Sequence, residues 1–178
     1  MPIMITKKQT GVSLLEVLIS ILVLSIGLLG LGKLQLFSLK GSNDAHFHTI
    51  ASFLAADLGD RMRINPDGVA LAGYAMSSSE NSSLCSSTPK LCLGSTTCSA
   101  SELASFDLYQ VSCGVKNGAY ESLGLKHLLP SATMSVDCGG TACNNNVQHT
   151  ITLTWQETDN NDADENIQIR TLIWNILP

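Results

Sequence analysis

The sequence predicts an α+β protein in which one long N-terminal helix carries a small antiparallel β-sheet head stapled by disulfides. Three observations support this fold class. Apolar residues are concentrated in the first third of the 178 residues, all six cysteines lie after residue 84, and apolar and polar residues alternate after residue 132. The charge is mildly acidic, with 10 Lys and Arg against 15 Asp and Glu. Because no basic block occurs, we expect no nucleic-acid partner for this chain.

The N-terminal segment combines a short basic leader with a long apolar run. Lys7 and Lys8 precede Gly11, and residues 12–32 then reach the length of about 20 apolar residues that crosses a bilayer. This run contains one charge, Glu16. A carboxylate inside a membrane costs about 2.5–3.5 kcal/mol, so a cation must compensate it. The lysines of the leader would stay in the cytoplasm and place the head outside.

Helical periodicity continues well beyond the apolar run. Apolar residues recur at steps of three and four, as one face of an amphipathic helix requires, at Leu36, Leu39, Phe47, Ile50, Ala51, Leu54, Leu58 and Met62. Asn65-Pro66 ends the pattern and Asp67-Gly68 predicts a turn. We therefore expect one helix over residues 12–63, about 75–80 Å long, and a head over residues 64–178.

The head is predicted to change from loop to helix to sheet along the chain. Residues 70–100 are rich in Ser and Thr and indicate a surface loop. Residues 103–129 show helical spacing with a break at Asn117-Gly118, which predicts one or two short helices. The alternation within residues 133–175 predicts three or four antiparallel strands that pack on the second half of the long helix.

The cysteines indicate an oxidising compartment. Their number is even, and they form no Cys-x-x-Cys pair with nearby histidines, so a zinc site is not expected. Three bridges would stabilise an exported domain with a thin core. Six cysteines allow fifteen pairings, of which the short loop closed by Cys138 and Cys143 is the local bridge that we favour. The disulfide candidates are Cys85, Cys92, Cys98, Cys113, Cys138 and Cys143.

Motifs for catalysis or cofactor binding are not expected in this chain. The acidic turn at residues 159–165 offers alternate oxygen ligands for calcium at Asn160, Asp162 and Asp164, but it has neither the glycine nor the final glutamate of an EF-hand. A solvated hairpin tip is the preferred interpretation. The histidines are scattered, at His46, His48, His127 and His149. Because the sequence also contains neither a nucleophile elbow nor a phosphate-binding loop, we predict no enzyme activity, metal or cofactor.

One motif carries a family resemblance. Gly11-Val12-Ser13-Leu14-Leu15-Glu16, after a basic leader and before an apolar helix, resembles the type III signal of type IV prepilins. The resemblance implies that residues 1–11 are a leader cut by prepilin peptidase between Gly11 and Val12. It also implies methylation of Val12, and pairing of Glu16 with the terminal ammonium of a neighbouring subunit. Val12 stands where the family usually has phenylalanine.

The wider sequence is similar to PilV-type minor pilins, the type IV pilus modification proteins. The similar parts are residues 13–19, Phe106-Asp107-Leu108-Tyr109 and the stretch that ends at Leu129-Pro130. This resemblance implies a structural subunit for pilus assembly or initiation, with effects on twitching, adhesion or DNA uptake. Its implied partners are prepilin peptidase, the major and other minor pilins, and inner-membrane lipid before assembly. The implied location is the inner membrane with a periplasmic head, then the extracellular pilus of a Gram-negative bacterium.

Several alternatives remain open from the sequence. A pseudopilin of type II secretion shares the signal and the helix. An exported soluble binding protein would use the same segment as a signal peptide cut after Gly32, and a plain membrane anchor would remain uncut. Gly27, Gly30 and Gly32 interrupt the apolar run at about 1 kcal/mol each. They predict either local melting during filament packing or close packing of helices through small residues.

Overall fold

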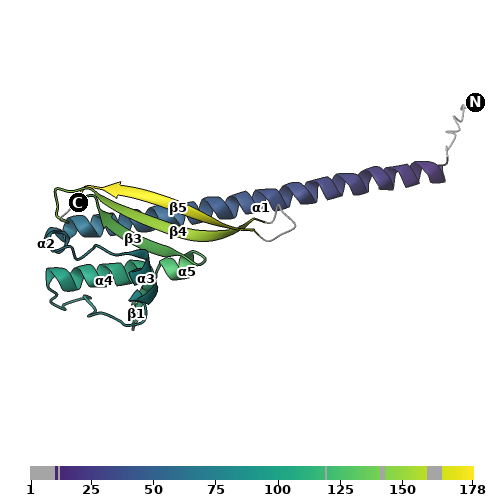
Figure 1. Cartoon of the computed structure of the whole chain (residues 1–178). Helices are drawn as coiled ribbons and strands as arrows, with labels where there is room; N and C mark the ends of the chain where they lie inside the picture. The colour runs from purple at the N-terminus through teal and green to yellow at the C-terminus, as the bar shows by residue number, and fades with distance from the viewer. Residues whose placement is uncertain (1–10, 12, 119, 141–142, 160–165) are drawn as a thin grey trace, which may run out of the picture. The chain divides into compact units, whose positions relative to one another are not determined.

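The computed structural model describes residues 11, 13–118, 120–140, 143–159 and 166–178, and the chain divides into two compact units. The first unit ends at Asn43 and the second runs from Asp44 to Pro178. Helix α1 (Leu14–Ile64) contributes its first part to one unit and its second part to the other (Figure 1). The long N-terminal helix, the small antiparallel sheets and the disulfides confirm the predicted α+β fold class.

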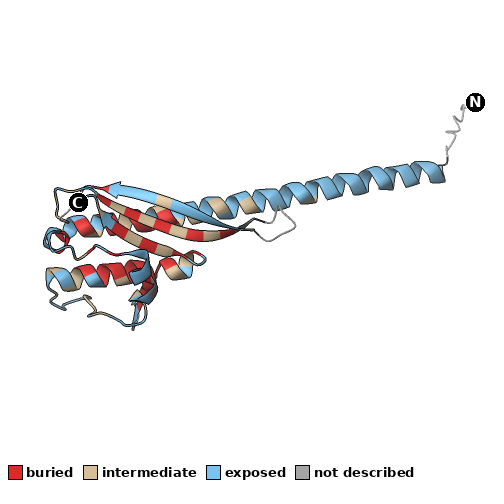
Figure 2. Cartoon of the chain, viewed as in Figure 1, coloured by how far each residue is buried: buried red, intermediate tan, exposed pale blue. Residues whose placement is uncertain are grey.

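The N-terminal unit consists of the apolar part of α1. Its most apolar window has a mean hydropathy of 2.6, and none of that window is buried within the chain. Figure 2 shows the helix coloured as exposed over residues 14–31. Such a surface is unfavourable in water, because each large apolar side chain that stays hydrated forgoes about 1.5–3 kcal/mol of burial. By length and composition α1 can therefore cross a membrane.

In the second unit, one face of α1 packs into a three-stranded antiparallel sheet. The sheet has the order β3 (Thr133–Cys138), β4 (His149–Asp159) and β5 (Asn166–Ile176). Small residues such as Ala51, Ala55 and Gly59 let the helix approach closely, and a Cβ on Gly59 would lie 2.7 Å from Cδ1 of Ile176. The inner face of the sheet completes the core with buried Met134, Val136, Ile151, Leu153 and Trp155.

A second helical layer follows α1 in the sequence. It contains α2 (Pro66–Ala70), α3 (Ser78–Leu84), α4 (Ala100–Cys113) and α5 (Leu125–Leu128). Capping boxes begin α3 and α4, since Ser77 pairs with Glu80 and Ser99 with Glu102 in both directions. These caps define where each helix starts within a Ser-rich stretch.

A small hairpin extends from the C-terminal end of α4. Strands β1 (Gly114–Asn117) and β2 (Tyr120–Leu123) form this two-stranded antiparallel sheet. Gly114 has a φ of 76°, and a Cβ there would lie 2.3 Å from the backbone oxygen of Ser122. Only glycine combines that backbone conformation with so close an approach of two strands.

The structure corrects three details of the sequence-based prediction. Residues 70–100 are not one surface loop, because α3 forms within them. Residues 114–123 form the β1–β2 hairpin, where only short helices and a break were expected. The turn predicted at Asp67-Gly68 lies within α2, whose N-cap is Asn65. The large sheet has three strands, and β4 pairs with β5 up to Asp159 and Asn166, as the predicted hairpin requires. The hairpin tip expected from the sequence falls on residues 160–165, which lie outside the described residues.

Candidate functional site

The first candidate site is the beginning of α1. The expected peptidase cleavage site after Gly11 lies here, together with Glu16, the one charged residue of the apolar run. Gly11 and Ser13 are exposed, and Val12 lies outside the described residues. The backbone oxygen of Ser13 accepts hydrogen bonds from the amides of Glu16 (2.9 Å) and Val17 (3.3 Å), so the helix starts immediately after it. Glu16 is therefore an exposed acidic residue in the first helical turn, where the helix dipole favours negative charge.

The three glycines of the apolar run lie inside continuous helix. A Cβ on Gly27, Gly30 or Gly32 would meet no heavy atom within 4 Å. The single chain thus gives these positions no steric reason for glycine. Both explanations predicted from the sequence, melting during packing and close approach of a second helix, require a neighbouring molecule.

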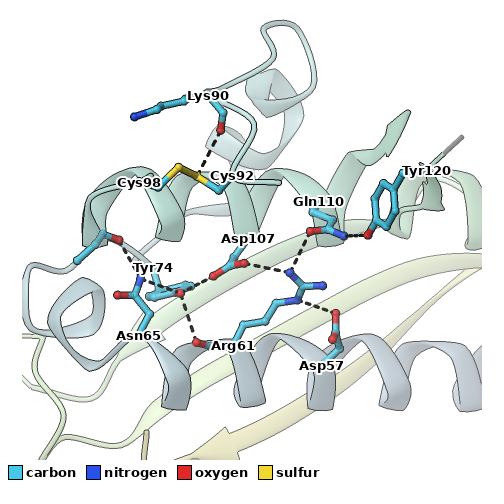
Figure 3. Close-up of polar contacts among 11 residues, drawn as sticks. Asp57, Arg61, Asn65, Tyr74, Lys90, Cys92, Cys98, Asp107, Gln110 and Tyr120 are labelled. Carbon is cyan, nitrogen blue, oxygen red and sulfur yellow. Dashed lines mark hydrogen bonds and ion pairs between the residues drawn. A yellow bond between two sulfur atoms is a disulfide. The ribbon is translucent and has the colours of Figure 1, made fainter. Parts of the chain in front are cut away.

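A polar network joins α1 to α4 within the head (Figure 3). Nη1 of Arg61 donates to Oδ1 of Asp107 and to Oε1 of Gln110, each at 3.0 Å, while its Nε donates to Asp57 at 3.0 Å. Tyr74 donates its hydroxyl hydrogen to Oδ2 of Asp107 at 2.6 Å. Asp107 is almost fully buried, and this network supplies partners for both of its oxygens.

The pKa values of Arg61 and Tyr74 are both raised in this network. Burial alone would lower the pKa of Arg61, but the hydrogen bond and charge of Asp107, with those of Asp57, raise it above the ordinary value. Burial and the hydrogen bond to Asp107 also raise the pKa of Tyr74 well above its usual range. The guanidinium and the phenol therefore keep their protons throughout the physiological range, and the network clamps α4 onto α1.

A second polar cluster secures the hairpin of β4 and β5. Glu157 is buried and accepts hydrogen bonds from Nε1 of Trp155 (2.8 Å) and Nε of Arg170 (2.7 Å). Burial alone would raise the pKa of Glu157, but the bonds from Arg170 and Trp155 outweigh it and lower the pKa below its ordinary value. His48 of α1 packs edge-on against Trp155, with ring centroids 4.9 Å apart. The cluster thus fixes the sheet on the helix.

All six cysteines are paired. The bridges are Cys85–Cys113, Cys92–Cys98 and Cys138–Cys143, and the last is the local bridge favoured from the sequence. The first joins the end of α3 to the end of α4, and the second closes the loop before α4. These two bridges tie down irregular segments around the helical layer, and the third lies in the segment between β3 and β4.

The structure does not assemble a metal centre from the residues it describes. In that part of the chain no three His, Cys, Asp or Glu side chains lie close enough to hold a metal ion. The calcium ligands considered from the sequence, Asn160, Asp162 and Asp164, lie outside it. His149 is buried, with Nδ1 2.9 Å from the backbone oxygen of Val147. His48 instead packs against the ring of Trp155.

Sequence reasoning missed the clamp around Arg61. Asp107 lies 46 residues from Arg61, and only the packing of α4 on α1 reveals their contact. The capping boxes, in contrast, had a readable signal, because Ser-x-x-Glu occurs at Ser77 and again at Ser99.

Comparison with protein families identifies two adjoining matches. A model of the prokaryotic N-terminal methylation motif matches residues 6–32, which include Gly11 and Glu16. A family model described as type IV pilin Tt1218 matches residues 33–109, from the middle of α1 to α4. No curated protein and no solved structure matches the chain.

Proposed function

We propose that the chain is a PilV-type minor pilin. It belongs to the type IV pilins, a group that here includes the related pseudopilins, and it carries a prepilin signal. In this proposal prepilin peptidase cuts between Gly11 and Val12 and the new N-terminal residue is methylated. The mature protein waits in the inner membrane of a Gram-negative bacterium with its head in the periplasm. It then enters the extracellular pilus with the major and other minor pilins, and contributes to assembly or initiation and thereby to twitching, adhesion or DNA uptake.

One observation carries the proposal: the first part of α1 is apolar and exposed, and it has a single carboxylate in its first turn. Before assembly, lipid can cover the apolar surface of α1. In a filament, neighbouring apolar helices would cover the same surface. Glu16 is then excluded from water and needs a cation at hydrogen-bond distance. Cleavage after Gly11 creates an ammonium group on the same helix end, and a neighbouring copy or relative can present it to Glu16.

Two measurements test this proposal together. Mass spectrometry of the mature N-terminus is expected to show methylated Val12. Glu16→Ala is expected to reduce the amount of the protein in sheared pili by at least about tenfold, the effect of losing roughly 1.4 kcal/mol of pairing. Ser20→Ala is the matched control, because its hydroxyl bonds only the backbone oxygen of Glu16 at 2.7 Å.

The alternatives predict different outcomes. A mature chain starting at Lys33 would identify an exported soluble protein, and an uncut chain would identify a plain anchor. Incorporation of Glu16→Ala at the wild-type level would refute the pairing. A deletion strain with normal pilus numbers but defective type II secretion would identify a pseudopilin.

A further inference from the structure

The outer strand of the large sheet has an open edge. On the opposite edge, β3 is partly covered, because Met76 and Val136 exchange backbone hydrogen bonds of 3.0 and 2.8 Å. Strand β5 pairs with β4 alone among the described residues. In an antiparallel edge strand, every second residue points its backbone N–H and C=O away from its partner. The free edge of β5 is therefore a row of hydrogen-bonding groups that matches another strand.

The same strand exposes an apolar stripe. The register with β4 turns Ile151, Leu153 and Trp155 towards α1, so Ile167, Ile169 and Ile173 of β5 lie on the outer face. Their exposed fractions are 63%, 69% and 61%. Their partners on β4 are uncharged Thr158, Gln156 and Thr152. This stripe, named the isoleucine stripe below, adjoins the open edge along most of its length.

Strand β5 has little of the usual protection against pairing with another chain. Proteins shield free edges with short strands, prolines, bulges or charged side chains. This strand has 11 residues and contains no proline. Its register with β4 is unbroken from Asn166 to Ile176. Its one charge, Arg170, is bound to Glu157 on the inner side of the sheet. An edge of this kind is expected to be covered in the working protein.

We propose that the β5 edge and the isoleucine stripe bind a β-strand of a different pilin-type subunit. The partner strand adds to the sheet through backbone hydrogen bonds. It places β-branched or aromatic side chains beside the stripe, with no charge opposite Ile167, Ile169 or Ile173, because such pairs stabilise adjacent strands. The identity of the partner rests on the proposed function, in which a sparse subunit has other subunits as its neighbours.

Site-specific photo-crosslinking tests the edge in the full chain. A benzophenone amino acid replaces Ile169 in one strain and Ser135 in another. Ser135 is the matched control, since it lies on the same outer face but on strand β3, next to the bridge between Val136 and Met76. Membranes and sheared pili are both analysed, and adducts are identified by mass spectrometry. We expect position 169 to yield an adduct with a different pilin-type subunit and position 135 to yield none.

Charge placed on the stripe provides an independent measurement. Ile169→Lys with Ile173→Lys is expected to reduce the amount in sheared pili about tenfold, because two apolar cross-strand pairs are lost and a charge meets the partner strand. Ser135→Lys is expected to remain within about twofold of the wild type. Both variants should keep the wild-type N-terminus and all three disulfides, since the isoleucine side chains are mostly exposed.

Three results would overturn the inference: no adduct at position 169, an adduct with a second copy only, or wild-type incorporation of the double lysine variant. A wrong proposed function would give a different result, because the wild-type protein itself would then be absent from pili. The adduct formed in the membrane fraction would still decide whether the edge binds a pilin-type subunit.

Discussion

Replacing Asp107 by asparagine tests whether the buried clamp holds α4 on α1. The substitution keeps the size of the side chain and removes the charge that Arg61 contacts at 3.0 Å and Tyr74 at 2.6 Å. Hydrogen bonds to charged groups contribute about 1.5–3 kcal/mol each. Removing one partner of a buried ion pair costs about 3–5 kcal/mol. Because the side chain of Arg61 is 26% exposed and keeps its bond to Asp57, we expect a smaller loss of about 2 kcal/mol.

Tryptophan fluorescence can report this loss from the head alone, because both tryptophans lie on the large sheet and Trp155 is buried. For the purified chain in detergent, with its disulfides intact, about 2 kcal/mol corresponds to a Tm lower by about 4–8 °C. The control is Asp60→Asn, whose carboxylate is 69% exposed in its pair with Arg63. Its expected change is below about 0.5 kcal/mol. Equal Tm values for the Asp107 and Asp60 variants would refute the clamp.

Three further predictions follow from the head. The lowered pKa of Glu157 means that its stabilisation is present above the unfolded pKa of about 4.3 and is lost as pH falls through the folded value. Glu157→Gln should therefore destabilise the head at pH 7, and its difference from wild type should shrink towards pH 3 in urea titrations. Replacing Cys85 and Cys113 together by serine opens a bridge of sequence separation 28 and should cost about 3–4 kcal/mol by denaturant unfolding. Gly114→Ala should lower the Tm strongly, whereas Gly94→Ala, also at positive φ but with no atom within 4 Å of its Cβ, should lower it by only a few degrees.

The elements that the sequence predicts well are those with long, regular periodicity. The helix expected over residues 12–63 is observed as Leu14–Ile64, because its stripe recurs over many turns and Asn65-Pro66 ends it. Strands β4 and β5 are likewise evident from residues that alternate over most of their length. Both patterns arise because one face of the element is buried, and burial of one face requires apolar residues at the period of a helix or a strand.

The missed elements are short or depend on distant partners. The β1–β2 hairpin has four residues in each strand, which are too few to show an alternating pattern. The chain enters β1 through Gly114, whose positive φ the sequence does not reveal. Helix α3 has seven residues in a Ser-rich segment, where composition favours a loop although the capping box of Ser77 was readable. The contact of Arg61 with Asp107 depends on tertiary packing, and neither residue is unusual in its local sequence.

The two parts of α1 are stabilised in different environments, so substitutions that weaken one part should affect different measured properties from substitutions that weaken the other. The described residues up to Asn43 have no buried core of their own, and their apolar surface requires lipid or neighbouring helices. From Asp44 onwards the helix has one buried face within the head, and the clamp at Arg61 fixes it there. Glu16 belongs to the first part and Asp107 to the second. A Glu16 variant should therefore keep the thermal stability of the head while it fails to enter the pilus. An Asp107 variant should be cut and inserted normally and fail through the reduced stability of its head.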